Sequence, residues 1–229
     1  MVRQTLQIKG DIPSIVRNDR GLYQGDLKHY FRAVFFDAPN VNHSYHNFRH
    51  MTHVLYLCYD ACLFYADKLT PREMRNILIA ALLHDYDHTG VSGDDAVNIK
   101  RAINGLFFHL AAEDVDDFDN IAYIIRCTQF PYELPSDKIS LSGQIIRDAD
   151  LSQVFSVAWI QQVVFGLSEE WGDKTPLEVL EMQEKYLRNV LHYHTEWGKQ
   201  KFPPSDIEEK IAEARALVEI LTGDPIRFA

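Results

Sequence analysis

The sequence predicts an all-α protein, and three observations carry that prediction. Two segments begin with Thr-Pro-x-Glu, the capping box with proline at the first helical position, at Thr70 and Thr175. Apolar residues recur at helical spacing over residues 44–66. Alternating β-branched and polar residues are absent, and the one short candidate strand, 121–125, also fits a helix ending near Phe130-Pro131. We expect a compact helical bundle forming a single domain over residues 1–229.

Individual helices follow from the same signals. The 44–66 helix carries an apolar stripe, and further helices are expected after Thr70, over 176–197 and over 205–222. In the last of these, Ser205 is the expected N-cap and Gly223 the expected end. The stripe of the first helix comprises Phe48, Met51, Leu55, Cys58, Cys62 and Tyr65.

Composition narrows the class of protein. The chain has 229 residues, is 46% hydrophobic and carries a formal charge of −10, which is ordinary for a globular protein and unfavourable for nucleic acid or anionic lipid. Its three cysteines fit neither a disulfide framework nor a zinc ribbon and are expected to be reduced and buried. No signal peptide or membrane span is evident. These features predict a cytoplasmic protein with no nucleic-acid or membrane partner; the oligomeric state stays open.

The first cluster of chemically active residues is Tyr-His-Asn-Phe-Arg-His. His46 and His50 are four residues apart, so on a helix they would lie on one face and could address one metal ion. The alternative is two unrelated histidines, which is the better interpretation of this cluster taken alone.

The second cluster is His-Asp-Tyr-Asp-His at residues 84–88, where an apolar run stops. His84 and Asp85 could reach one metal ion alongside the helix, and the two oxygens of Asp85 could bridge two ions. A solvated helix end is the alternative, but the helix dipole disfavours aspartates at a C-terminus.

The third and fourth clusters are weaker. Asp150 is a candidate N-cap paired with Gln153, or a metal ligand, and Asp148 is a lesser candidate beside the site. His192 and His194 are two residues apart and therefore lie on different faces of a helix, which indicates packing.

Together the clusters offer an open set of nitrogen and oxygen ligands, which is typical of catalytic metal sites. The motifs of serine hydrolases, P-loop proteins, dinucleotide-binding folds and HExxH metalloproteases are absent. The proposed ligands are His50, His84, Asp85 and Asp150.

The motifs YHNFRHMTHV, HDYDHTGVS and DADLS, in this order, resemble those of class I 3′,5′-cyclic-nucleotide phosphodiesterases within the HD-domain superfamily of metal-dependent phosphohydrolases. The resemblance extends over residues 44–172 and is closest over 44–100. It implies an all-α fold of the HD type and a small-molecule phosphoester or nucleotide as substrate.

The resemblance also implies roles for the residues. Two divalent ions (zinc, iron, manganese or magnesium) would be held by the four proposed ligands, with Asp85 reaching both ions. His46 would be the general acid for the leaving oxygen, and His88 would lie beside a hydroxide that bridges the ions. Asn47 would orient a neighbour.

The sequence departs from the family pattern in three places. Gly93 stands where the family has asparagine, although Asn98 follows. The Glu-Asn-His-His element has only Glu113 and His109 as loose counterparts. Near the C-terminus there is no Gln-x-x-Phe-[Ile/Leu] element, which grips the purine in the family. Alternatives therefore stay open: a 5′-nucleotidase-type HD hydrolase, a di-iron oxygenase, or a non-catalytic ligand-binding HD module.

Overall fold

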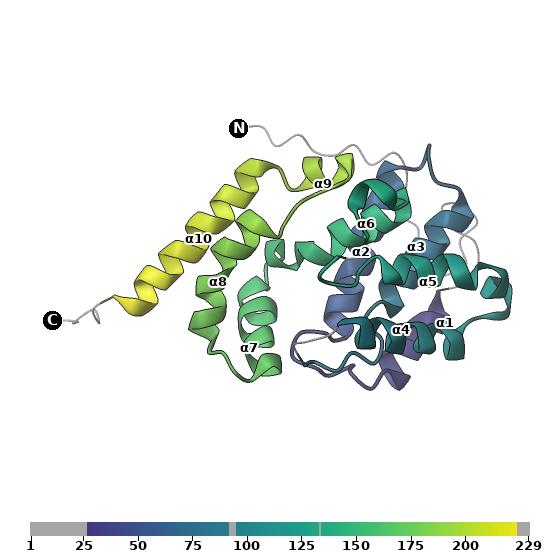
Figure 1. Cartoon of the computed structure of the whole chain (residues 1–229), viewed down its shortest axis with the longest axis horizontal. Coiled ribbons are helices and arrows are strands. Elements are labelled where there is room, and N and C mark those ends of the chain that lie inside the picture. Colours follow the sequence, from purple (N-terminus) through teal and green to yellow (C-terminus); the bar gives the residue numbers. More distant parts are fainter. Residues whose placement is uncertain (1–26, 92–94, 133, 224–229) are drawn as a thin grey trace.

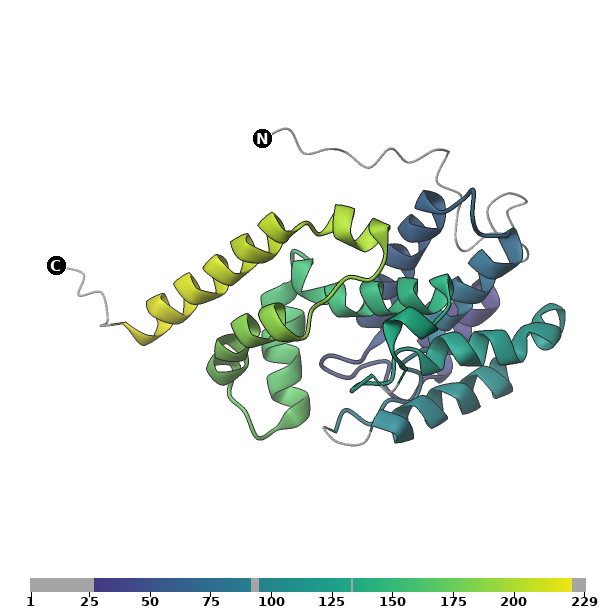
Figure 2. The ribbon, with the colours of Figure 1, turned by 45° about the horizontal axis from the view of Figure 1, so that its top comes forward.

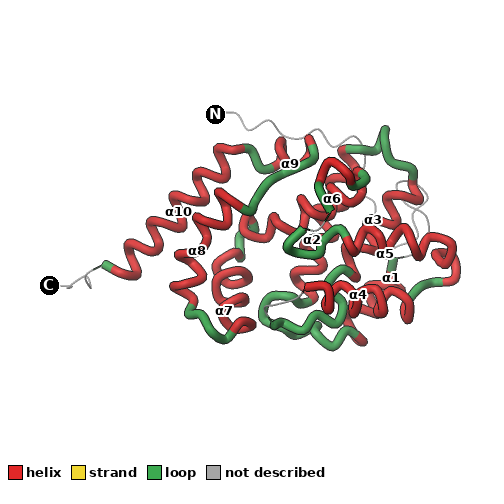
Figure 3. The backbone as a smooth tube through the Cα atoms, viewed as in Figure 1, coloured by secondary structure: helices red, strands yellow, loops and turns green. Residues whose placement is uncertain are grey.

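The computed structural model describes residues 27–91, 95–132 and 134–223, and within them every regular element is helical (Figure 3). The predicted all-α class is confirmed. Gly93 lies outside the described residues.

The helices are named in chain order, with η marking short 3₁₀ or π segments. They are α1 (Lys28–Arg32), η1 (Ala33–Asp37), α2 (Phe48–Phe64), α3 (Pro71–Leu83), α4 (Asp95–His109), η2 (Ala112–Asp117), α5 (Phe118–Arg126), η3 (Ser136–Lys138), α6 (Leu141–Asp150), η4 (Leu151–Phe155), η5 (Ile160–Phe165), α7 (Gly166–Trp171), α8 (Pro176–Asn189), α9 (Glu196–Lys201) and α10 (Pro204–Thr222).

The helices form two packed groups (Figure 1). In the first, α2 packs on α3 and α6, α3 also contacts α5, and the interior is one large apolar cluster. In the second, α8 packs between α10 and η5 around a smaller apolar cluster. Figure 2 shows α10 running outward from the body alongside α8. The polar candidates described below lie where the two groups meet.

The predicted capping boxes are both present. The Thr70 side chain accepts from the Glu73 amide and Glu73 bonds back to the Thr70 amide; Thr175 and Glu178 repeat this arrangement. The start of α10 differs from the predicted start. Pro203 is the N-cap and Ser205 makes no capping bond, because Pro204 takes the first helical position, whereas the end at Gly223 is confirmed.

The helix predicted over 176–197 is wrong in its second half. α8 ends at Asn189, and α9 does not begin until Glu196. The reason is a tertiary contact: the buried carboxylate of Asp148 accepts bonds from the backbone amides of His194 and Thr195 and from the Thr195 hydroxyl. These amides would otherwise have helical partners, so the link between α8 and α9 is extended.

The three cysteines are buried free thiols, as expected. Among the described residues, no single helix has the length and apolar character needed to cross a membrane. One bent pair, Leu141–Phe155 with Ile160–Trp171, meets the requirement by length and composition alone.

Candidate metal centre and active site

Four side chains from three segments converge at the junction of the helix groups. The His50 Nε2 atom lies 3.0 Å from Asp150 Oδ1 and 3.2 Å from Asp85 Oδ2. The His84 Nε2 atom lies 3.2 Å from the same Asp85 oxygen, 3.5 Å from Asp150 Oδ1 and 3.3 Å from His50 Nε2. The four residues proposed as ligands from the sequence are therefore brought together.

Local structure explains how each ligand candidate is positioned. Asn47 is the N-cap of α2 and accepts from the Arg49 and His50 amides, which places His50 in the first turn. His84 is the C-cap of α3, and Asp85 follows it in the turn. Asp150 is the last residue of α6 and makes no capping bond, so the N-cap interpretation of Asp150 is wrong.

Asn40 joins the two histidine motifs. Its amide nitrogen donates to the backbone carbonyls of His46 and Asp85, at 2.6 and 2.7 Å, and its oxygen accepts from the Asp87 amide. The side chain is fully buried. Sequence reasoning missed this residue because a lone asparagine outside the motifs gives no pattern signal.

The Nδ1 atoms of His50 and His84 each lie beside an oxygen that can accept a hydrogen bond. His84 Nδ1 lies 2.9 Å from the Ala81 carbonyl oxygen, and His50 Nδ1 lies 3.3 Å from Gln153 Oε1. A carbonyl oxygen only accepts, so Nδ1 of His84 carries a proton, and the Nε2 atom faces the carboxylates. The Gln153 oxygen likewise accepts from Nδ1 of His50. In metal-binding histidines one ring nitrogen is held by such a contact while the other binds the ion.

The spacing of these atoms suits a cation between them. Ligand atoms bonded to one ion at about 2.1 Å lie about 3.0 Å apart at a right angle and about 3.4 Å apart at the tetrahedral angle. The separations of 3.0–3.5 Å span that range. In addition, Asp85 Oδ2 is buried without a properly oriented hydrogen-bond donor among the described residues, although two imidazole nitrogens are 3.2 Å away. The donor set therefore fits a divalent metal ion.

The pKa values of the four ligand candidates are shifted because two histidines and two aspartates lie close together. Burial alone lowers the pKa of His50, but bonding to Asp150 and Asp85 outweighs it and raises the pKa to about 9. The pKa of His84 is raised for the same reason, against its burial. The pKa values of Asp85 and Asp150 are lowered, since the two histidines outweigh the effect of burial. A positive charge is thus favoured at this point.

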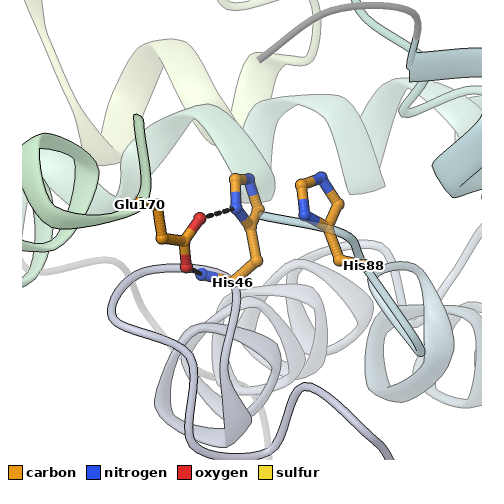
Figure 4. A group of neighbouring side chains, drawn as sticks. All are labelled: His46, His88 and Glu170. Carbon is orange, nitrogen blue, oxygen red and sulfur yellow. Dashed lines mark hydrogen bonds and ion pairs between the residues drawn. The ribbon is translucent and has the colours of Figure 1, made fainter. Parts of the chain in front are cut away.

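A second group consists of His46, His88 and Glu170 (Figure 4). It adjoins the first, since the His46 ring lies 6.1 Å from the His50 ring. The His46 Nδ1 atom is 2.6 Å from Glu170 Oε2, while Glu170 Oε1 accepts from the backbone amides of Tyr45 and His46 at 2.6 and 2.8 Å. A separation of 2.6 Å is shorter than two ligands of one ion adopt, so this is a hydrogen-bonded pair.

The other ring nitrogen of His46, Nε2, has no hydrogen-bond partner among the described residues. The carboxylate of Glu170 is fixed by the two backbone amides and orients the imidazole, because it accepts the Nδ1 proton. Burial by itself raises the pKa of Glu170, but the bonds from His46 and the amides lower it overall, so the carboxylate is charged at neutral pH. Sequence reasoning missed Glu170, which lies 124 residues from His46 on α7.

His46 itself lies outside α2, before the N-cap Asn47, so the expected stacking of His46 and His50 on one helical face is wrong. The two rings are 6.1 Å apart at 83°. The reason is the cap, since Asn47 must leave the helical conformation to bond the first-turn amides. The loop before the helix is free to turn His46 toward Glu170.

His88 supports His46 from the other side. Its ring stacks on the His46 ring at 3.6 Å and 19°. The Gly90 amide donates to Nδ1 at 3.0 Å, and Nε2 lies 2.9 Å from the Asn98 amide. Burial lowers the pKa of His88 to about 4, so the ring is neutral. A neutral aromatic face favours a cation stacked on it.

Other residues singled out in the sequence lie elsewhere. Asp87 pairs with Arg101, and Asp148 holds the chain near Thr195. His109 bonds Tyr86, while Glu113 lies near Arg75, so neither adds to the two groups described above.

Residues 45–109 match the family model of the 3′5′-cyclic nucleotide phosphodiesterases. Over this segment the chain is similar to those phosphodiesterases, and the match indicates a phosphodiesterase-like hydrolase. No protein of curated function matches the sequence. The matched segment of this phosphodiesterase-like chain includes both histidine motifs and ends before Asp150 and Glu170, so those two residues join the site on geometry alone.

Proposed function

We propose that the chain hydrolyses a phosphoester bond of a small molecule, a nucleotide or 3′,5′-cyclic nucleotide, with two divalent ions as cofactors. The observation that carries the proposal is the approach of both histidine Nε2 atoms to the buried, otherwise unpartnered Asp85 Oδ2 at 3.2 Å. His50, His84, Asp85 and Asp150 would hold the first ion, and Asp85 would also contact the second.

When bound, the ions would lower the pKa of a shared water and offset negative charge on the phosphoryl oxygens. The chain supplies the proton for the leaving group. His46, oriented by Glu170 and stacked on neutral His88, donates from its free nitrogen to the departing alkoxide. Glu170 accepts from Nδ1 and so holds the His46 ring in one orientation for the transfer.

The test is a substitution in the ligand set with a matched control in the same motif. Asp85→Asn removes a charge at the centre of the cluster, and we expect hydrolysis of phosphodiesters with added manganese to fall by about 100-fold or more. Metal content, measured by elemental analysis, falls in parallel while helical circular dichroism is kept. Asp87→Asn, which removes only the pair with Arg101, serves as the control and keeps activity.

A panel of substrates and metal ions separates the alternative functions. A panel of cyclic mononucleotides, nucleoside 5′-monophosphates and simple phosphodiesters, each with manganese, magnesium or zinc, distinguishes a diesterase from a 5′-nucleotidase. Tightly bound iron with oxygen-dependent turnover would indicate an oxygenase. Full activity of Asp85→Asn would contradict the two-ion proposal.

A further inference from the structure

His46 is held by hydrogen bonds at three of its atoms. Its backbone amide donates to Glu170 Oε1 at 2.8 Å, and its ring nitrogen Nδ1 lies 2.6 Å from Glu170 Oε2 (Figure 4). The third contact is at the other end of the residue, where the backbone carbonyl accepts from Asn40 Nδ2 at 2.6 Å. Glu170 therefore fixes the ring and the amide of His46, and Asn40 fixes its carbonyl.

The same side-chain nitrogen of Asn40 also holds the turn that follows α3. Nδ2 donates to the Asp85 carbonyl at 2.7 Å, and Oδ1 accepts from the Asp87 amide at 2.8 Å. Asp87 has a φ of 62°, in the left-handed region that is unfavourable for residues other than glycine. The bond from the Asp87 amide to Asn40 helps to hold this backbone conformation, and with it the turn that carries Asp85.

The Asn40 amide bonds only backbone atoms. Two of its partners are carbonyl oxygens, which can only accept, and the third is an N–H group, which can only donate, so the orientation of the side-chain amide is fixed. Among side chains of this length, only asparagine offers two donors on one atom and an acceptor on another. Asn40 is fully buried, so the loss of one of these bonds would leave a backbone group without a partner.

We propose that Asn40 is a positioning residue that holds His46 in register with the turn of the metal-ligand candidates. The proposal rests on the proposed function, in which proton delivery and metal binding act on one phosphoryl group. Because one nitrogen bonds both segments, the backbones of His46 and Asp85 cannot move apart without breaking a buried hydrogen bond. Asn40 takes no part in the bond-breaking step and acts through His46.

Asn40→Asp tests this role with little change of shape. A carboxyl group has at most one proton to donate, so it cannot bond both carbonyl oxygens at once. We expect kcat for a substrate with a poor alkoxide leaving group to fall by about 10- to 100-fold, because a small displacement of the proton donor is costly. With bis(4-nitrophenyl) phosphate, whose leaving group needs no proton, we expect a loss of less than about threefold. Metal content should match that of the wild-type chain.

Asn42→Asp is the control, since it makes the same change at an exposed position two residues along the chain and should keep activity with both substrates. Adding Asn40→Asp to His46→Asn measures whether Asn40 acts through His46. The added substitution is expected to lower kcat for the poor leaving group by less than about threefold further. A full additional loss, or equal losses with both substrates in Asn40→Asp alone, overturns the proposal.

An NMR measurement without substrate makes the outcome independent of hydrolysis. The His46 ring stacks on the His88 ring at 3.6 Å, so the ring current of His88 shields the ring protons of His46. Asn40→Asp is expected to move these signals toward their unstacked positions, and Asn42→Asp to leave them in place. Loss of the signals in His46→Asn assigns them. Unchanged signals in Asn40→Asp overturn the proposal.

Asn40→Ala covers the case in which Asn40→Asp does not fold. It removes the same two donors and leaves room for water beside the backbone groups, and the same kinetic and NMR results are expected. A wild-type chain that hydrolyses none of the phosphoesters would refute the proposed function. The ring signals of His46 would then decide by themselves whether Asn40 positions this residue.

Discussion

At the scale of single residues, His46 stands apart from the ligand candidates. It bonds Glu170 and stacks on His88, and it lies before the helix that carries His50. In the proposed function, this arrangement separates proton delivery from metal binding. The two roles can therefore be tested with different substitutions.

Replacing His46 with asparagine is expected to lower kcat by roughly 100-fold or more for substrates with a poor alkoxide leaving group. With bis(4-nitrophenyl) phosphate the loss should be much smaller, since 4-nitrophenolate leaves without a proton. Metal content should match that of the wild-type chain. Loss of metal in this variant would instead make His46 a ligand.

Glu170→Gln tests the partner that orients His46. A neutral amide is a weaker acceptor for the His46 Nδ1 proton and orients the ring less firmly, so kcat for a poor leaving group is expected to fall by about tenfold or more, with KM and metal content little changed. Glu169→Gln, at the exposed neighbouring position, is the control. Equal losses with good and poor leaving groups would argue against a role in proton delivery.

At the scale of helices, α4 approaches the turn after α3 more closely than a side chain allows. A Cβ atom on Gly105 would overlap Tyr86 Cδ1 and lie 2.7 Å from Tyr86 Cγ. Tyr86 in turn bonds the Asp37 carbonyl and His109, and it follows Asp85 directly in the chain. The glycine therefore helps to set the position of the His84-Asp85 turn.

Gly105→Ala provides the corresponding prediction. In an exposed helix this change would stabilise by about 0.5–1 kcal/mol, but overpacking costs typically about 1–3 kcal/mol. We expect a net loss of about 1–2 kcal/mol in the free energy of unfolding, measured in urea, together with reduced hydrolysis. Asn104→Ala, at the exposed neighbouring position of α4, should change stability by less than about 0.5 kcal/mol. A stabilised Gly105→Ala variant would contradict the predicted clash.

At the scale of the whole molecule, one buried ion pair joins three distant segments. Asp114 in η2 accepts from Arg75 of α3 at two positions, both at 2.7 Å, and from the Tyr30 hydroxyl of α1 at 2.6 Å. Arg72 adds an outer contact. Asp114 and Arg75 are both fully buried. Breaking such a pair leaves an uncompensated charge inside the protein.

This pair predicts a dependence of stability on pH. Burial raises the pKa of Asp114, but Arg75, Tyr30 and Arg72 outweigh it and lower the pKa below its ordinary value. The stabilisation is therefore complete above the unfolded-state pKa of about 4 and is lost as the pH falls through the lowered pKa in the folded state.

Asp114→Asn is expected to cost about 3 kcal/mol at pH 7. The difference from the wild-type chain should shrink as the pH is lowered from 5 to about 3. Urea unfolding across this range measures it, with exposed Asp116→Asn as the control. A difference that is constant with pH would show that the charge of Asp114 does not contribute.

Much of the site was predictable because its motifs are local. The capping boxes depend on residues three apart, and the His-Asp pair is recognisable because it ends an apolar run. The same local signals predict four ligand candidates. Glu170 and Asn40 were not predictable, since they contact partners distant in the chain and a single polar residue gives no spacing pattern.

The sequence alone therefore determined the helical class, the helix starts with local caps and the residue types of the ligand candidates, because each depends on neighbours within a turn or two. Tertiary structure decided the break after Asn189, the place of His46 outside its helix and its pairing with Glu170. Each of these features depends on which buried polar groups come into contact when the two helix groups pack. Such contacts supply hydrogen-bond partners that residues nearby in the sequence do not provide.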